Sequence, residues 1–204
     1  LGEENQGFTY LMQDLPQERL SVAISGIAAG ESILQQTVSY TMERKAFGKP
    51  ISHLQNTQFK LAELDTELTA ARVFLDRCLE LHLSKDLDTV TASKAKLLCT
   101  DLQFKVMDEC LQLHGGYGYM WEYPVARAWA DARVQKIYAG TNEIMKLIIA
   151  RSLTKWTFLI NEQGLRCLGD IYQESPLHLG IMPHYFASLA FPNLNLITRH
   201  YATS

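Results

Sequence analysis

The sequence predicts an all-α protein built around an antiparallel helical bundle. Two observations carry this prediction: apolar residues recur at alternating three- and four-residue steps over long stretches, and glycine or proline residues separate those stretches. With 204 residues, of which 47% are hydrophobic and 20% charged, the chain is long enough to bury one sizeable core. We therefore expect one main domain, over residues 14–154.

The first helix is predicted over residues 15–44. Asp14 followed by Pro16 is a helix-start signal, because a side-chain acceptor caps free backbone N–H groups and proline's fixed φ suits a first turn. Residues 1–13, rich in glycine and polar side chains, indicate a linker or an entry strand. The apolar stripe of this helix consists of Leu20, Ala23, Ile27, Leu34, Val38 and Met42, and the break at Gly48 and Pro50 follows it.

Two more long helices are predicted. The second carries the seam Leu61, Leu64, Leu68, Ala71, Leu75, Cys78 and His82. The third carries Ala92, Ala95, Cys99, Leu102, Val106, Cys110 and Leu113. Residues 86–88 separate the two helices, and the pair Gly115-Gly116 is a C-terminal glycine signal for the third. Seams with this spacing face the inside of a bundle.

Two shorter helices complete the predicted domain. An amphipathic segment occupies residues 125–137, and Thr141 opens a last helix. The apolar residues of that last helix are Ile144, Leu147, Ile148 and Leu153. Four or five helices that share one core form an antiparallel bundle of the four-helix type.

The pattern changes after residue 154. Three of the six prolines (Pro176, Pro183 and Pro192) fall in residues 155–204, charges are sparse, and no helical or strand periodicity persists. We expect this segment to be an unstructured tail.

Composition excludes several classes of function. The net charge of -3 and the lack of a dense Lys/Arg run exclude nucleic acid as a partner. No apolar run approaches the roughly 20 residues of a spanning helix, so the chain is not an integral membrane protein. The cysteines form no CxxC pair and the histidines lack metal-ligand spacing. We therefore expect buried thiols, a reducing compartment and no metal site.

Four motifs occur in one order along the chain: LPQERL at 15–20, RKAFGKPI at 44–51, LQLHGGYGYMWEYP at 111–124 and IYAGTNEI at 137–144. Together with the helices between them, they resemble the C-terminal helical domain of the acyl-CoA dehydrogenase family over residues 1–154. The string QLHGGYGYMWEYP is closest to the long-chain type. The resemblance implies that the chain is the downstream piece of a longer subunit, that residues 1–13 are a linker or the end of a β-domain, and that residues 155–204 lie outside the family pattern.

The resemblance also implies a catalytic base. Many family members place a carboxylate directly after the Tyr of the YxGT motif, but the residue here is Ala139, which has no titratable group. A subset of the family instead uses a glutamate near the start of the first long helix, and the matching residue is Glu18. The alternative is that Glu18 only complements the positive end of that helix. Because Ala139 cannot act as a base, we favour a catalytic Glu18.

Further residues match positions that bind FAD or substrate in the family. The cofactor-binding positions are Arg44, Phe47, Gln55, Gln112, Leu113, His114, Gly115, Gly116, Thr141, Asn142 and Glu143. The substrate-binding positions are Arg19, Tyr138, Ala139 and Gly140, with the Ala139 N–H on the thioester carbonyl. Several have a plainer alternative: Arg19 as an exposed helix arginine, Arg44 as a cation at a helix end, Gln55 as a helix-start residue, the glycines as a helix stop, and Thr141 as an N-cap.

The expected function is FAD-dependent α,β-dehydrogenation of an acyl-CoA in fatty acid β-oxidation, and we expect this chain to be an incomplete and, on its own, inactive part of that enzyme. The resemblance further implies electron-transferring flavoprotein as acceptor, a homodimer or homotetramer with FAD shared across subunits, and the mitochondrial matrix, with the bacterial cytoplasm as the alternative. The other function considered is a truncated, non-catalytic helical protein that associates with intact subunits.

Overall fold

The computed structural model describes residues 2–154, 158–161 and 164–167, which fall into two compact units, Leu1–Thr154 and Lys155–Ser204. Residues 2–154 form the helices α1 (Gly7–Glu43), α2 (Gln55–Leu83), α3 (Thr89–His114), α4 (Pro124–Gln135) and α5 (Asn142–Leu153). Between them lie strands β1 (Lys45–Ala46) and β2 (Lys49–Pro50) and the 3₁₀ helices η1 (Ile51–His53) and η2 (Gly115–Tyr119). The predicted all-α bundle is confirmed.

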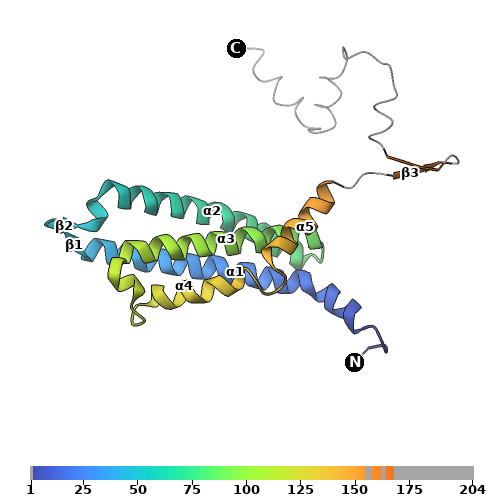
Figure 1. Cartoon of the computed structure of the whole chain (residues 1–204), viewed down its shortest axis with the longest axis horizontal. Helices are drawn as coiled ribbons and strands as arrows, with labels where there is room; N and C mark the ends of the chain where they lie inside the picture. The colour runs from blue at the N-terminus through green and yellow to red at the C-terminus, as the bar shows by residue number, and fades with distance from the viewer. Residues whose placement is uncertain (1, 155–157, 162–163, 168–204) are drawn as a thin grey trace, which may run out of the picture. The chain divides into compact units, whose positions relative to one another are not determined.

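Helices α1 to α4 lie side by side, each running opposite to the one before it, and α5 crosses them at an angle (Figure 1). The first helix packs mainly against α3. Gly26 permits this close approach, because a Cβ at that position would lie 3.3 Å from the Cys99 carbonyl oxygen. The most extensive packing of the bundle is therefore between the two helices that carry most of the site residues described below.

The seams predicted for α2 and α3 form the core. Their buried members are Leu64, Leu68, Ala71, Leu75, Cys78, Ala92, Ala95, Cys99, Leu102, Val106 and Cys110. Burial raises the pKa of the Cys99 thiol to about 12 and that of Cys110 to about 11, as expected for small apolar residues in a core. These thiols are unsuited to nucleophilic or metal chemistry.

The stripe predicted on α1 is buried at Leu20, Ala23, Ile27 and Leu34, but Met42 is exposed. Near this end of α1, Thr37 and Thr41 take the buried positions instead. Each donates its hydroxyl hydrogen back to the helix, Thr37 to the Ile33 carbonyl and Thr41 to the Val38 carbonyl, both at 2.8 Å. A threonine that bonds in this way can replace an apolar residue inside a helix interface.

The predicted start of the first helix was wrong. Helix α1 begins at Gly7, and both Asp14 and Pro16 lie inside it. The Tyr10 N–H already donates to the Gln6 carbonyl at 3.1 Å, so helical hydrogen bonding is established before the proline. A proline signals a helix start only when the residues before it cannot continue the helix, and here they do.

The predicted break at residues 86–88, the glycine stop at 115–116 and the start at Thr141 agree with the structure. Asp88 caps α3 by accepting from the N–H groups of Val90 and Thr91 at 2.8 and 3.0 Å. Gly115 ends α3 with a φ of +60°, a conformation that favours glycine. Thr141 caps α5 by accepting from the Ile144 N–H at 3.4 Å.

In the second unit, strands β3 (Phe158–Asn161) and β4 (Gly164–Cys167) pair antiparallel, with Asn161 opposite Gly164. The prediction of no regular element after residue 154 was therefore wrong for these residues. Phe158 and Ile160 are types that favour strands, and two residues separate the strands, a common hairpin spacing. The rest of the predicted tail lies outside the described residues.

Within the described part of the chain, no helix is long and apolar enough to cross a membrane. The same residues contain no group of three or more His, Cys, Asp or Glu side chains that could hold a metal ion.

Candidate active site and dinucleotide site

The loop between α4 and α5 is held against α1 by a buried arginine. Arg19, 4% exposed, donates from Nε to the Ala139 carbonyl oxygen at 3.5 Å and from its guanidinium to the Ser93 hydroxyl at 3.3 Å. Burial lowers the pKa of Arg19, and the neighbouring charge of Glu18 opposes that shift. The alternative of an exposed helix arginine is thereby removed, and the structure brings three of the predicted substrate-site residues, Arg19, Ala139 and Gly140, into one place.

Glu18 directly precedes Arg19 on α1, and it is exposed. Because α1 begins at Gly7, Glu18 lies well inside the helix and not in its first turn. The positive end of a helix acts only over its first turn, so the alternative role of complementing the helix start is contradicted. Glu18 is therefore a solvent-accessible carboxylate next to Arg19, the residue that is hydrogen-bonded to the loop between α4 and α5.

The loop has an unusual backbone. Ala139 has a φ of +54° and Gly140 a φ of +91°. A Cβ at Gly140 would lie 2.8 Å from Met145 Cε, the end of a flexible side chain, so glycine is needed there for its conformation rather than for space. Alanine rarely adopts a positive φ, and strain of this kind concentrates at binding and catalytic sites.

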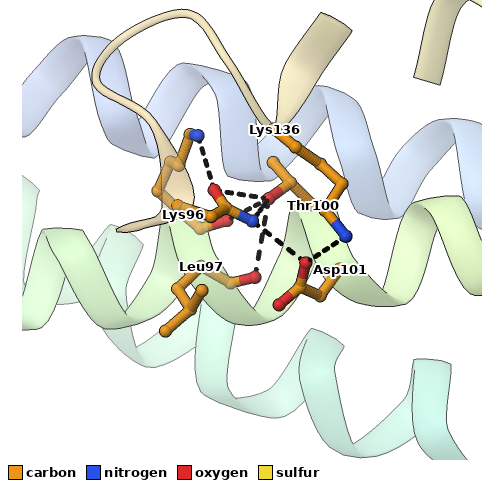
Figure 2. Close-up of polar contacts among 6 residues, drawn as sticks. Lys96, Leu97, Thr100, Asp101 and Lys136 are labelled. Carbon is orange, nitrogen blue, oxygen red and sulfur yellow. Dashed lines mark hydrogen bonds and ion pairs between the residues drawn. The ribbon is translucent and has the colours of Figure 1, made fainter. Parts of the chain in front are cut away.

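The first residue of α5, Asn142, is fixed by its side chain. Figure 2 labels Lys96, Thr100, Asp101 and Lys136 around it and draws Asn142 itself without a label. Asn142, 2% exposed, accepts from Lys96 Nζ at 2.7 Å and donates to Thr100 Oγ1 and Asp101 Oδ1, both at 3.0 Å. Lys136, at the other end of the loop, pairs with the same Asp101 oxygen at 2.7 Å. The Asn142 side chain is thus used within the fold, which leaves only its backbone for the predicted cofactor contact.

The flanking residues of that segment are differently placed. Thr141 is half-buried and caps α5, so the N-cap alternative is confirmed for it. Glu143 is exposed, and backbone N–H groups at the helix start and the Thr141 hydroxyl lower its pKa. Tyr138 is 46% exposed, on the outside of the loop.

A second cluster lies near the far end of the bundle, where α1 and α3 end. It is a pocket of about 590 Å³ lined by Tyr40, Arg44, Ile51, Gln112, Leu113, His114, Gly115, Gly116, Tyr117 and Met120. Gly115 and Gly116 face open space, since nothing lies within 4 Å of a Cβ built on either. The structure thus brings Arg44 together with residues 112–116 in one pocket.

Aromatic stacking shapes this pocket. The buried His114 ring stacks on Tyr40 with ring centroids 4.1 Å apart, and its Nδ1 lies 2.8 Å from the Cys110 carbonyl oxygen. The Tyr40 hydroxyl donates to the His114 carbonyl at 3.2 Å, and the Arg44 guanidinium lies 5.3 Å from the Tyr117 ring centroid. His114 is therefore a wall of the pocket, and Tyr40 and Tyr117 are lining residues that the sequence analysis missed.

The β1–β2 hairpin follows Arg44 and carries the solvent-exposed aromatic ring of Phe47. Strands β1 and β2 pair through Ala46 and Lys49, so Phe47 and Gly48 are the two turn residues. Both have positive φ, 53° and 79°, as in the type I′ turns that normally take Asn-Gly. Phe47 is 94% exposed, so its ring makes little contact within this chain. Gln55 begins α2 and is exposed, outside the pocket lining.

The sequence analysis also missed the polar residues beside the α3 seam. Ser93, Lys96, Thr100 and Gln103 are all buried, each directly after an apolar seam residue. Their three- and four-residue steps repeat the period of the seam. A polar stripe in register with an apolar one is the signal that could have revealed them.

This bundle is a helical domain with two candidate sites, the loop held by Arg19 and the glycine-lined pocket. The comparisons with known proteins specify its family. Residues 5–154 match the family described as "Acyl-CoA dehydrogenase, C-terminal domain". The chain therefore belongs to the acyl-CoA dehydrogenase family, a family of flavoprotein oxidoreductases.

Relatives support the same assignment. The mitochondrial long-chain specific acyl-CoA dehydrogenase of Mus musculus is 58% identical over 153 residues, which are 75% of this chain and 36% of that protein. A crystal structure of an acyl-CoA dehydrogenase from Geobacillus kaustophilus is 49% identical with a TM-score of 0.74, over 76% of this chain and 40% of that one. Butyryl-CoA dehydrogenase from Megasphaera elsdenii is 37% identical with a TM-score of 0.73, over the same shares. The chain thus spans well under half the length of these relatives.

Proposed function

We propose that this chain is the C-terminal part of a long-chain acyl-CoA dehydrogenase with Glu18 as its catalytic base. The contact between Arg19 and Ala139 carries the proposal, because it fixes the helix that bears Glu18 against the loop that bears the Ala139 N–H. Abstraction of an α-proton needs a base and a stabilised carbonyl oxygen close together. This domain supplies a candidate for each.

The roles of the two groups follow from their chemistry. The Glu18 carboxylate takes the proton from the carbon next to the thioester. The Ala139 N–H donates to the thioester oxygen, where negative charge develops as the proton leaves. Because Ala139 has no carboxylate, only its backbone N–H takes a role in the proposed reaction.

The far pocket has features that suit the FAD dinucleotide. Arg44 is exposed and takes part in none of the ion pairs of the described residues, so its guanidinium is free to bind a pyrophosphate bidentately. Gly115 and Gly116 allow close backbone approach, and Phe47 offers a ring for stacking. Bound FAD would supply the acceptor for the β-hydride. A glutaryl-CoA dehydrogenase from Mycobacterium smegmatis, 28% identical to this chain, is described in complex with FADH2.

The distance between the two clusters supports binding of two different FAD molecules. Glu18 and Arg44 are 26 positions apart on or at the end of α1, which is about 39 Å of helix at 1.5 Å per residue. The carboxylate of one cluster and the guanidinium of the other therefore lie far apart along the helix. We therefore propose a homo-oligomer in which the pocket at Arg44 binds the FAD of a neighbouring subunit.

The finer assignments rest on relatives. The 58% identical mouse protein is long-chain specific and mitochondrial, which supports long-chain acyl-CoA esters and the mitochondrial matrix for this protein. A 34% identical structure is described as the electron transferring flavoprotein of Acidaminococcus fermentans, which supports such a flavoprotein as redox partner.

The test uses a completed subunit, meaning the N-terminal part of the mouse relative joined to this chain, beside the mouse parent and the 204-residue chain alone. We expect the completed subunit to retain FAD and its flavin absorbance to bleach with palmitoyl-CoA, faster than with butyryl-CoA. We expect the chain alone to do neither. A folded completed subunit that binds FAD but is not reduced by any acyl-CoA would contradict the proposed activity.

A further inference from the structure

Both ends of the loop from Lys136 to Asn142 are bonded to one carboxylate. Asp101 Oδ1 accepts from Lys136 Nζ at 2.7 Å and from Asn142 Nδ2 at 3.0 Å (Figure 2). The Asn142 backbone N–H donates to the Lys136 carbonyl at 3.0 Å, which closes the loop on itself. One residue of α3 therefore fixes the distance between the two ends.

The direction of the Asn142 amide is determined by its surroundings. Lys96 can only donate, so the amide oxygen of Asn142 must face Lys96 and its NH₂ group must face Asp101. Thr100 supports this arrangement, since its hydroxyl hydrogen goes to the Lys96 carbonyl at 2.8 Å and its oxygen can accept from Asn142. The network is satisfied in one orientation only.

The middle of the loop has little else to hold it. Among backbone bonds of the described residues, none is donated by Ala139, Gly140 or Thr141. Among the described residues, its one side-chain hydrogen bond from α1 is the long Arg19 bond to the Ala139 carbonyl. The positive φ values of Ala139 and Gly140 therefore depend on how the loop ends are placed.

We infer that Asp101 is a positioning residue for the acyl-thioester site: together with Lys136 and Asn142 it forms a clasp that fixes the direction of the Ala139 N–H. This inference rests on the proposed function, because that function gives the Ala139 N–H its role. The clasp itself is a property of the fold and can be tested without flavin or substrate. Sequence motifs of the loop do not reveal it, since Asp101 lies on another helix.

The first test is amide hydrogen exchange on the full 204-residue chain. In Asp101→Ala and in Lys136→Met we expect exchange of the Asn142 amide to accelerate about tenfold, the effect of one lost charge-assisted bond, while the Val106 amide in the α3 core is unchanged. Glu67→Ala is the matched control: it removes the Lys105–Glu67 ion pair, 2.6 Å long and similarly exposed, without touching the loop. Equal exchange at Asn142 in all variants would overturn the clasp.

The second test is steady-state kinetics of the completed subunit. Asp101→Ala should lower kcat about 10- to 100-fold and leave KM for palmitoyl-CoA and FAD content within about twofold, because a misdirected N–H loses charge stabilisation in the transition state. Asp101→Asn, which keeps an acceptor oxygen, should recover part of kcat, and Glu67→Ala should keep all of it. Unchanged kcat in Asp101→Ala would overturn the positioning role. If the unsubstituted completed subunit shows no acyl-CoA-dependent turnover, the proposed function fails instead, and the exchange result still decides the clasp.

Discussion

The Nε of Arg19 donates to the Ala139 carbonyl oxygen across 120 positions of sequence, at 3.5 Å. This contact joins the residue that follows Glu18 on α1 to the loop that carries the Ala139 N–H. The helix and the loop that carry the two groups of the proposed reaction are therefore joined through the buried Arg19 guanidinium. Its removal affects both stability and geometry.

Arg19→Lys should lower the free energy of unfolding of the 204-residue chain by about 1–3 kcal/mol, measured by urea denaturation. A lysine ammonium lacks the planar fork that reaches both Ser93 and Ala139, so at least one buried acceptor loses its donor. Arg77→Lys, in an exposed ion pair, should change the same quantity by less than about 0.5 kcal/mol. If both substitutions changed the free energy of unfolding equally, the hydrogen bonds of Arg19 would not stabilise the fold as proposed.

The buried Lys96 predicts a pH dependence of stability. Burial lowers its pKa from 10.5 to about 8, opposed by the charges of Asp101 and Glu143. Between pH 8 and 10.5 the unfolded chain then binds more protons at this residue, so its contribution to stability rises with pH and is least favourable below pH 8. The difference in unfolding free energy between Lys96→Met and the unsubstituted chain should change by about 1–3 kcal/mol in favour of the lysine from pH 7.5 to 10. The exposed Lys94→Met should show a flat difference.

Ala139→Glu should restore a base to Glu18→Gln. The position has the positive φ of +54° that alanine already tolerates, so glutamate adds little further backbone strain. Many family members carry their base there, and Arg19 holds this loop beside Glu18. In the completed subunit we expect the double substitution to be at least about tenfold faster in flavin reduction than Glu18→Gln alone. No gain, with FAD content intact, would mean that the two positions do not face the same substrate carbon.

Phe47→Asn should separate stability from cofactor binding. Asparagine accepts the left-handed conformation of this turn better than phenylalanine does, so the free energy of unfolding should stay equal or rise by up to about 1 kcal/mol. The completed subunit should nevertheless bind FAD about tenfold more weakly, because a stacking ring is lost. Phe59→Asn, an exposed phenylalanine of α2, is the control and should leave FAD affinity unchanged. Unchanged FAD affinity in Phe47→Asn would contradict the proposal that the Phe47 ring stacks on FAD.

Much of the bundle could be predicted because the signals for its helices lie between residues that are close in sequence. The seams of α2 and α3 repeat at the helical period, and Asp88, Gly115 and Thr141 mark helix ends through chemistry within a few residues. Pro16 misled because it suits both a first turn and an interior position whose lost hydrogen bond is tolerated. Strands β1 and β2 have two residues each, too short for any period to be visible.

Only those parts of the candidate site that are contiguous in the sequence could be predicted. Motifs located Glu18, Arg44, residues 112–116 and the loop around Ala139, but not the groups that hold them. Asp101 meets Lys136 and Asn142 through tertiary packing, and no sequence period joins positions 35 and 41 residues apart on different elements. Tyr40 was missed for the same reason, since its role depends on stacking with His114 from another helix.

The most direct test is pre-steady-state flavin reduction by palmitoyl-CoA in the completed subunit, with and without Glu18→Gln. Removing the base should slow reduction about 10²- to 10⁴-fold while FAD content and helical circular dichroism stay unchanged. Glu43→Gln, an exposed carboxylate at the end of the same helix, should reduce at the unsubstituted rate. If Glu18→Gln is reduced as fast as the unsubstituted subunit, Glu18 is not the base and the proton is taken by another group.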